Sequence, residues 1–195
     1  MALPLSLLTA LVVISYGPGG SLGCNLSPNH VLVTRENIVL LGQMRRISPS
    51  LCLDDRKAFR FPEEVVDGSQ VQETQAISVL CELLWQTSRV FLTERSSAAW
   101  NTTLLDKLRT GLHWQLQDLD TCLEQETGQA EPALGKKDPT LAVKRYFLRI
   151  RLYLKEKKYS DCAWEIVREE IMTCFSSSTK LQERLRKKDG DLGSP

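Results

Sequence analysis

Apolar residues recur every three or four positions in five segments of the chain, which is the spacing of one face of an α-helix. The longest stripe lies within residues 101–123, and a weaker one lies within residues 30–44. The stripes consist of Val31, Ile38 and Leu41; Ile77, Leu80, Leu84 and Phe91; Leu105, Leu108, Leu112, Leu116, Leu119 and Leu123; Val143, Phe147, Ile150 and Leu154; and Trp164, Val167, Ile171 and Phe175. No segment alternates convincingly as a strand would, so we predict an all-α bundle of five helices.

Two long polar connections interrupt this helical pattern. Residues 45–68 show no clear periodicity, and residues 124–139 are rich in glycine and proline. Long connections inside a compact domain are usually functional, and long crossovers between helices occur in cytokine bundles. We therefore expect both segments to be surface loops of the bundle.

The N-terminus has the features of a signal peptide over residues 1–23. It carries no charged side chain, and its apolar run ends at Tyr16, before a Gly-Pro-Gly-Gly turn. Ser21 and Gly23 are small residues at the spacing that signal peptidase accepts, whereas the alternative is a folded N-terminal helix. We predict a secreted single domain over residues 24–195, with a flexible tail from about residue 187. No later apolar run is long enough for membrane insertion.

Composition and motifs argue against several other classes. The formal net charge of +1 does not favour a nucleic-acid partner. The only histidines are His30 and His113, and no CxxC pair occurs, so we expect no metal site and no cofactor. No catalytic motif is present, and the adjacent glutamates at 63–64 and 169–170 fit a solvated surface, so an enzyme is not expected.

All six cysteines lie beyond the predicted cleavage point, in a chain expected to enter an oxidising compartment. Six cysteines allow 15 pairings, and spacing alone does not choose among them. A bridge from Cys52 to Cys162 would hold the long loop on the last helix. A bridge from Cys24 to Cys122 would hold the N-terminus on the leucine-striped helix.

Several long motifs resemble type I interferon sequences, most like the omega or tau subgroup. They read CNLSPNH, CLDDRKAFRFP, ERSSAAWNTTLLDKL, AVKRYF and YLKEKKYSDCAWEIVREEIM, and the resemblance extends from Cys24 to about Arg186. It implies a five-helix type I interferon-like cytokine bundle with long crossover loops. It also implies the two bridges just named, with Trp164 as a core residue beside the second one.

The resemblance leaves Cys81 and Cys174 without a family bridge. They are either a third disulfide or two free thiols on separate helices, and we expect free thiols. Cys81 lies off the apolar stripe of its helix, so we expect it to be exposed.

The resemblance also implies two receptor-binding faces. The face for the high-affinity receptor chain carries over to Leu53, Arg56, Arg168, Glu169, Met172, Thr173 and Ser176. The face for the low-affinity chain carries over to Glu82, Trp85, Ser88, Arg89, Leu104, Arg109, His113 and Lys144. The family often has a small residue at the place of Glu169 and an arginine at the place of Thr173. An aromatic residue and a tyrosine are often found at the places of Ser88 and His113.

Three further features of the sequence suggest surface roles. Trp85 and Trp114 lie off the apolar stripes of their helices, where they would serve an interface or pack against a neighbouring element. Arg56 can donate a bidentate pair to a partner carboxylate. Asn101 begins an N-glycosylation sequon, and the alternative for this residue is an unmodified helix cap.

The resemblance implies a secreted, monomeric cytokine that bridges two receptor chains. Bridging would bring their intracellular kinases together and trigger antiviral and antiproliferative signalling. The alternative function is a secreted four-helix-type cytokine of another family with a different receptor.

Overall fold

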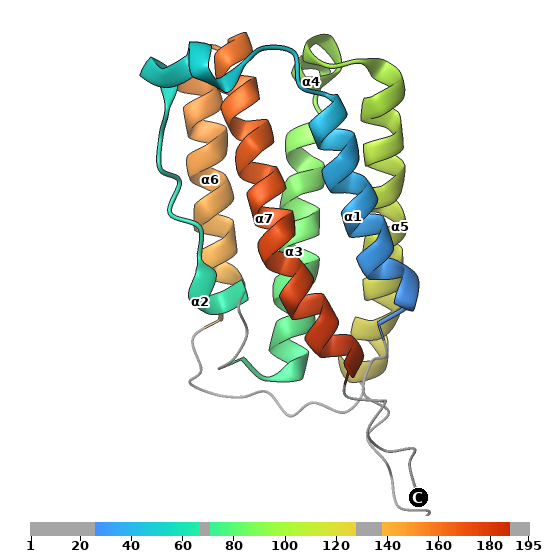
Figure 1. The fold of residues 1–195 in the computed structure, drawn as a ribbon. Helices are drawn as coiled ribbons and strands as arrows, with labels where there is room; N and C mark the ends of the chain where they lie inside the picture. Colours follow the sequence, from blue (N-terminus) through green and yellow to red (C-terminus); the bar gives the residue numbers. More distant parts are fainter. Residues whose placement is uncertain (1–25, 67–70, 128–137, 188–195) are drawn as a thin grey trace, which may run out of the picture.

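The computed structural model describes residues 26–66, 71–127 and 138–187 of the chain. These residues form seven α-helices, one 3-10 helix and no strand (Figure 1). The elements are α1 (Pro28–Gln43), η1 (Pro49–Asp55), α2 (Glu63–Val66), α3 (Glu73–Phe91), α4 (Glu94–Ala99), α5 (Thr102–Thr127), α6 (Thr140–Glu156) and α7 (Asp161–Lys187). The predicted signal peptide and the end of the predicted tail lie outside the described residues.

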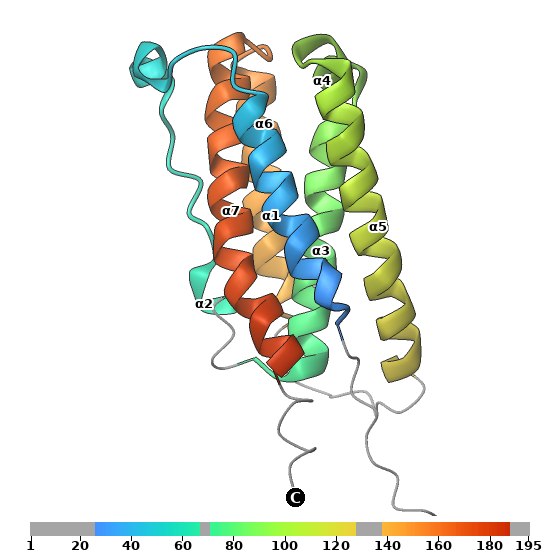
Figure 2. The same cartoon turned by 45° about the vertical axis from the view of Figure 1, so that its right-hand side comes forward.

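The five long helices, α1, α3, α5, α6 and α7, form the predicted bundle. In both views α1 lies between α7 and α5, and α3 lies behind them in contact with α5, α6 and α7 (Figures 1 and 2). Most of the predicted stripe residues are buried in one shared core, although Ile38, Leu116 and Leu123 are only partly buried. The prediction of an all-α bundle is therefore confirmed, because the stripes supply the apolar surface that the helices bury together.

The predicted loop at residues 45–68 contains two short helical segments. η1 and α2 lie on the connection from α1 to α3, which runs along α6 (Figure 1). Both are too short to produce a recognisable apolar period, which explains why the sequence pattern did not predict them. The second predicted loop begins later than expected, because α5 continues to Thr127.

Side-chain caps fix the starts of two long helices. The Asn101 Oδ1 atom accepts a hydrogen bond from the Leu104 backbone amide at 3.2 Å, at the start of α5. The Ser160 hydroxyl accepts one from the Ala163 amide at 3.2 Å, at the start of α7. Each cap satisfies a backbone donor that has no partner inside its own helix.

A buried polar network joins α1, α5 and α7 inside the otherwise apolar bundle. Gln115 of α5 donates to the Thr34 hydroxyl at 2.7 Å and accepts from the Asn37 side-chain amide at 2.9 Å. The Thr34 hydroxyl in turn donates to the Gln182 side chain of α7 at 3.0 Å. At Gly111 a Cβ atom would lie 2.5 Å from the Asn37 Oδ1 atom, so any side chain at residue 111 would force the Asn37 side chain to shift.

No helix in the described ranges is long and apolar enough to cross a membrane.

Candidate functional site

A disulfide between Cys52 and Cys162 joins η1 to the first turn of α7. The two Cα atoms are 5.3 Å apart although the residues are separated by 110 positions in sequence. Beside the bridge, the buried Trp164 packs edge to face against Trp100, with ring centroids 6.0 Å apart. The predicted Cys52–Cys162 pairing and the core position of Trp164 are both confirmed.

Side chains of α6 hold the connection from α1 to α3, which we call the crossover segment, between Asp55 and Arg60. Arg149 donates to the Phe59 carbonyl at 2.8 Å and to the Arg60 carbonyl at 3.0 Å. The Tyr153 hydroxyl donates to the Asp55 carbonyl at 2.8 Å. Burial, together with the nearby Asp55 carboxylate, raises the pKa of Tyr153 to about 12, so its hydroxyl keeps the proton that it donates. These contacts give the segment one defined course over the bundle.

Exposed residues of the crossover segment and of α7 line two hollows that share Thr173. A hollow of about 450 Å³ is lined by Arg56 of the crossover and by Glu169 and Thr173 of α7. A second hollow of about 430 Å³, between α2 and α7, is lined by Thr173 and Ser176. We call the exposed residues of this surface the crossover face: Leu53, Arg56, Glu169, Thr173 and Ser176. Five of the seven residues predicted for the high-affinity site are thus exposed, and four of them, all but Leu53, line these two hollows.

The structure corrects the expectation for Arg168. Its side chain is only 3% exposed, and it forms an ion pair with Glu165, which is 1% exposed. A further guanidinium nitrogen donates to the Leu41 carbonyl of α1 at 3.1 Å and lies 2.9 Å from the Met172 sulfur. Because α1 covers this edge of α7, Arg168 links the two helices and is not presented to a partner. Met172 is partly buried against the core for the same reason.

A second exposed surface lies on α3, α5 and α6. Glu82, Trp85 and Arg89 follow one another along α3, and the Glu82 carboxylate lies 3.7 Å from the Lys144 ammonium of α6. Trp85 is about half exposed, as its position off the apolar stripe predicts. We call these six positions the helical face: Trp85, Arg89, His113 and Lys144 are exposed, whereas Glu82 and Leu104 are partly buried.

Two residues predicted for the low-affinity face, Ser88 and Arg109, do not belong to the helical face. Ser88 is buried, because α3 packs on several sides against α5, α6 and α7. Arg109 donates two hydrogen bonds to the Phe91 carbonyl, at 2.8 and 3.0 Å, and one to the Ser97 hydroxyl at 2.8 Å. Its guanidinium therefore satisfies a carbonyl at the end of α3 and fixes the turn into α4.

The two remaining thiols, Cys81 and Cys174, are free in the structure. Cys174 is fully buried, and Cys81 is half-buried with its sulfur 4.0 Å from an Asp120 carboxylate oxygen. The expectation that Cys81 is exposed is therefore wrong, because α5 covers part of that side of α3. Cys24 lies outside the described residues, so the Cys24–Cys122 bridge stays a prediction.

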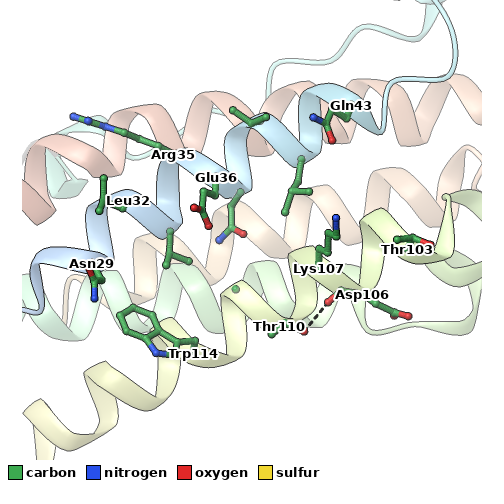
Figure 3. Close-up of a pocket in the computed structure, with 15 residues that line it drawn as sticks. Asn29, Leu32, Arg35, Glu36, Gln43, Thr103, Asp106, Lys107, Thr110 and Trp114 are labelled. Atoms are coloured by element: carbon green, nitrogen blue, oxygen red, sulfur yellow. Dashed lines mark hydrogen bonds between the residues drawn. The ribbon is translucent and has the colours of Figure 1, made fainter.

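A hollow of about 1250 Å³ is lined by residues of α1 and α5, on the opposite side of α1 from α7 (Figure 3). Trp114 lies at one end of it, about a third exposed, with its ring 6.3 Å from that of the buried His30. Burial lowers the pKa of His30, although the Asp118 carboxylate, 3.3 Å from its Nδ1 atom, opposes this shift. Trp114 thus both packs against a neighbouring side chain and remains partly open to solvent.

No group of three or more histidine, cysteine or acidic side chains in the described ranges is arranged to hold a metal ion.

Comparisons with known proteins agree with this architecture. A family model described as "Interferon alpha/beta domain" matches residues 26–185. The chain is 68% identical to interferon omega-1 of Bos taurus, 69% identical to interferon omega-2 of Equus caballus and 62% identical to interferon tau of Cervus elaphus, in each case over 100% of both chains. Among solved structures, zebrafish interferon 2 superposes with a TM-score of 0.65 at 23% identity, over 80% of this chain and 99% of that chain. The last similarity indicates a shared fold.

Proposed function

This chain belongs to the interferon alpha/beta family, and from that premise we propose that it is a secreted ligand of the type I interferon receptor. Members of this family are cytokines and not enzymes, so the chain is a cytokine. Family membership also removes the alternative of a helical cytokine from another family. The resemblance to the omega and tau subgroup agrees with the names of the similar relatives.

In this proposal the crossover face binds the high-affinity receptor chain. The observation that supports it is the Cys52–Cys162 disulfide, which holds η1, and with it Leu53, against α7. Arg56, at the end of η1, lines the same hollow as Glu169 and Thr173. A rigid surface loses little conformational entropy when it binds, which favours affinity. Arg56 is exposed and can pair in a bidentate manner with a carboxylate of the receptor.

The helical face binds the low-affinity receptor chain in the same proposal. Trp85 is its most prominent apolar side chain, and exposed tryptophans are favoured at the centres of interfaces. The crossover face uses η1 and α7, whereas the helical face uses α3, α5 and α6. Because the two faces share no helix, one monomer can contact two receptor chains at once and bring their intracellular kinases together. The result is antiviral and antiproliferative signalling.

The proposal includes the processing of the chain. Residues 1–23 are removed as a signal peptide, and Asn101 carries an N-linked glycan on its exposed side-chain amide. Asn101 uses its Oδ1 atom to cap α5, and glycan attachment uses the other atom of the amide, the nitrogen. The cap and the glycan are therefore compatible.

An antiviral assay on cells with and without the type I interferon receptor tests this function. Protection is expected in receptor-bearing cells and should be absent in receptor-deleted cells. Protection that persists without the receptor would refute the proposal.

A second assay separates the two faces. Arg56→Ala is expected to weaken the high-affinity chain alone, and Trp85→Ala the low-affinity chain alone, when each isolated chain is measured by surface plasmon resonance. Loss of both affinities in either variant would contradict the assignment of separate faces.

A further inference from the structure

The outer face of α6 carries a row of exposed leucines. Leu141, Leu148 and Leu152 are 45%, 48% and 56% exposed, although the opposite side of the same helix is buried in the core. Intervals of seven and four residues place the three leucines within a narrow strip along the helix. Scattered exposed leucines are common on protein surfaces, but three of them aligned along one helix form an apolar row.

Cations border this strip on both sides. α6 contains five basic residues and one acidic residue, whereas the whole chain has a formal net charge of only +1. Arg149 and Arg151 are engaged within the bundle, by the Phe59 carbonyl and by the Gln86 side chain. Arg145 and Lys155 are exposed, one on each side of the leucine strip, and neither forms an ion pair in the part of the chain that the structure describes.

We propose that the outer face of α6 binds the surface of an anionic lipid bilayer. The three leucines would enter the boundary between headgroups and acyl chains, while Arg145 and Lys155 extend to the lipid phosphates. Anionic headgroups complement the cations, and the acyl boundary accepts the leucines, so one ligand satisfies both features. The binding is peripheral, consistent with the lack of a membrane-spanning helix in the described ranges.

Two comparisons favour this ligand. A polyanionic glycan would use the cations but would leave the leucine strip in water. The larger hollow between α1 and α5 carries rim charges of both signs, Arg35 and Lys107 beside Glu36 and Asp106, so it complements no single class of charged ligand (Figure 3). The outer face of α6 differs because its free charges have one sign.

Vesicle flotation of the secreted protein tests the proposal. Binding should be about tenfold stronger to vesicles of phosphatidylcholine with phosphatidylserine than to phosphatidylcholine alone, and added salt should weaken it. The triple variant Leu141→Gln, Leu148→Gln and Leu152→Gln should lose about tenfold in binding to the anionic vesicles. Far-UV circular dichroism checks that this variant remains folded.

Two matched controls complete the test. The triple variant Leu32→Gln, Leu51→Gln and Leu92→Gln removes exposed leucines elsewhere and should bind the vesicles like the parent. Arg145→Gln with Lys155→Gln should weaken binding, whereas Arg45→Gln with Lys107→Gln, which removes the same charge elsewhere, should weaken it less.

Three outcomes would overturn the proposal. They are no binding to anionic vesicles, equal losses in the α6 and control leucine variants, and vesicle binding that depends on the cations but not on the α6 leucines. If the α6 leucine variant instead keeps its vesicle binding and loses affinity for a receptor chain, the strip contacts a protein. Receptor binding is measured separately, so failure here leaves the proposed cytokine function untouched.

Discussion

Arg168 and Glu165 form an ion pair across one turn of α7, and both side chains are almost completely removed from solvent. One Glu165 oxygen accepts from two guanidinium nitrogens, and the other has no hydrogen-bond partner within the described structure. Arg168 also donates to the Leu41 carbonyl of α1. The charge of Glu165 therefore depends on one arginine for compensation.

Arg168→Ala should lower the free energy of unfolding by about 3–5 kcal/mol, because it leaves the buried Glu165 carboxylate unpaired. Urea unfolding followed by circular dichroism measures the change. Arg45→Ala, at an exposed position, should have little effect. Replacing the pair together, with Arg168→Met and Glu165→Leu, should recover much of the loss. A stable Arg168→Ala protein that has lost only receptor affinity would contradict this structural role.

Removal of the Cys52–Cys162 bridge, with both residues changed to serine, should lower the free energy of unfolding by about 4–5 kcal/mol in the chain-entropy model. The bridge closes a long loop and so restricts the unfolded chain. Urea unfolding without reductant measures the effect, and Cys81→Ser serves as the control because its thiol is free.

Non-reducing peptide mapping should recover Cys52–Cys162 and Cys24–Cys122, and a link from Cys52 to Cys81 or Cys174 would refute this pairing.

Arg56→Ala should weaken binding to the high-affinity receptor chain by about 2 kcal/mol or more, as hot-spot arginines do. Arg56 is exposed beside the hollow that Glu169 and Thr173 line, so the substitution removes a donor without disturbing the core. Surface plasmon resonance on the isolated receptor chain measures the affinity. Arg35→Ala, on the outer side of α1, is the matched control. No change beyond experimental error would move the binding site away from the crossover segment.

Glu169→Ala combined with Thr173→Arg should tighten binding to the high-affinity chain if the facing receptor surface is acidic. The two residues lie one turn apart on α7 and line the same hollow. The double variant removes a repulsive carboxylate and adds a cation, which should slow dissociation and speed association. Salt should reduce the gain, because exposed charges are screened within ~10 Å at 0.1 M. Equal or weaker binding without salt dependence would argue for a neutral partner surface.

Alkylation of Cys81 should be slow at neutral pH in the folded protein. Burial, followed by the carboxylates of Asp120 and Glu82, raises the pKa of Cys81 to about 11, and only the thiolate reacts. The rate should rise about tenfold per pH unit until the pH approaches that value. Iodoacetamide labelling read by mass spectrometry measures it, and Asp120→Asn should accelerate it. Cys174, which is fully buried, should react only after unfolding, so rapid labelling of Cys174 in the native protein would contradict its position.

The apolar periodicity predicted the bundle because each long helix buries most of the stripe that its own sequence shows. Leu108 and Leu112, for example, lie four residues apart and are both completely buried. The pairing of Cys52 with Cys162 followed from resemblance, since the spacing of six cysteines does not select a partner.

Periodicity could not predict the features that depend on neighbouring elements. Arg168 lies at the edge of its apolar stripe, and only the position of α1 decides that it is buried. The course of the crossover depends on Arg149 and Tyr153, whose acceptors are backbone carbonyls. Every residue offers the same backbone carbonyl whatever its side chain is, so such contacts leave no signature in the sequence.

The close approach of Gly111 to Asn37 limits the order in which this chain can change during evolution. A side chain at residue 111 would collide with Asn37, which also donates to Gln115 in the polar network. A side chain at 111 therefore requires the Asn37 side chain to shift or a smaller residue at 37, and in either case the hydrogen bond to Gln115 is put at risk. Substitutions at these positions are expected to be strongly non-additive, because they share partners. If α1 of one relative replaced α1 of another, the hybrid would fold well only when residue 37 of the incoming helix fits beside residue 111 of α5.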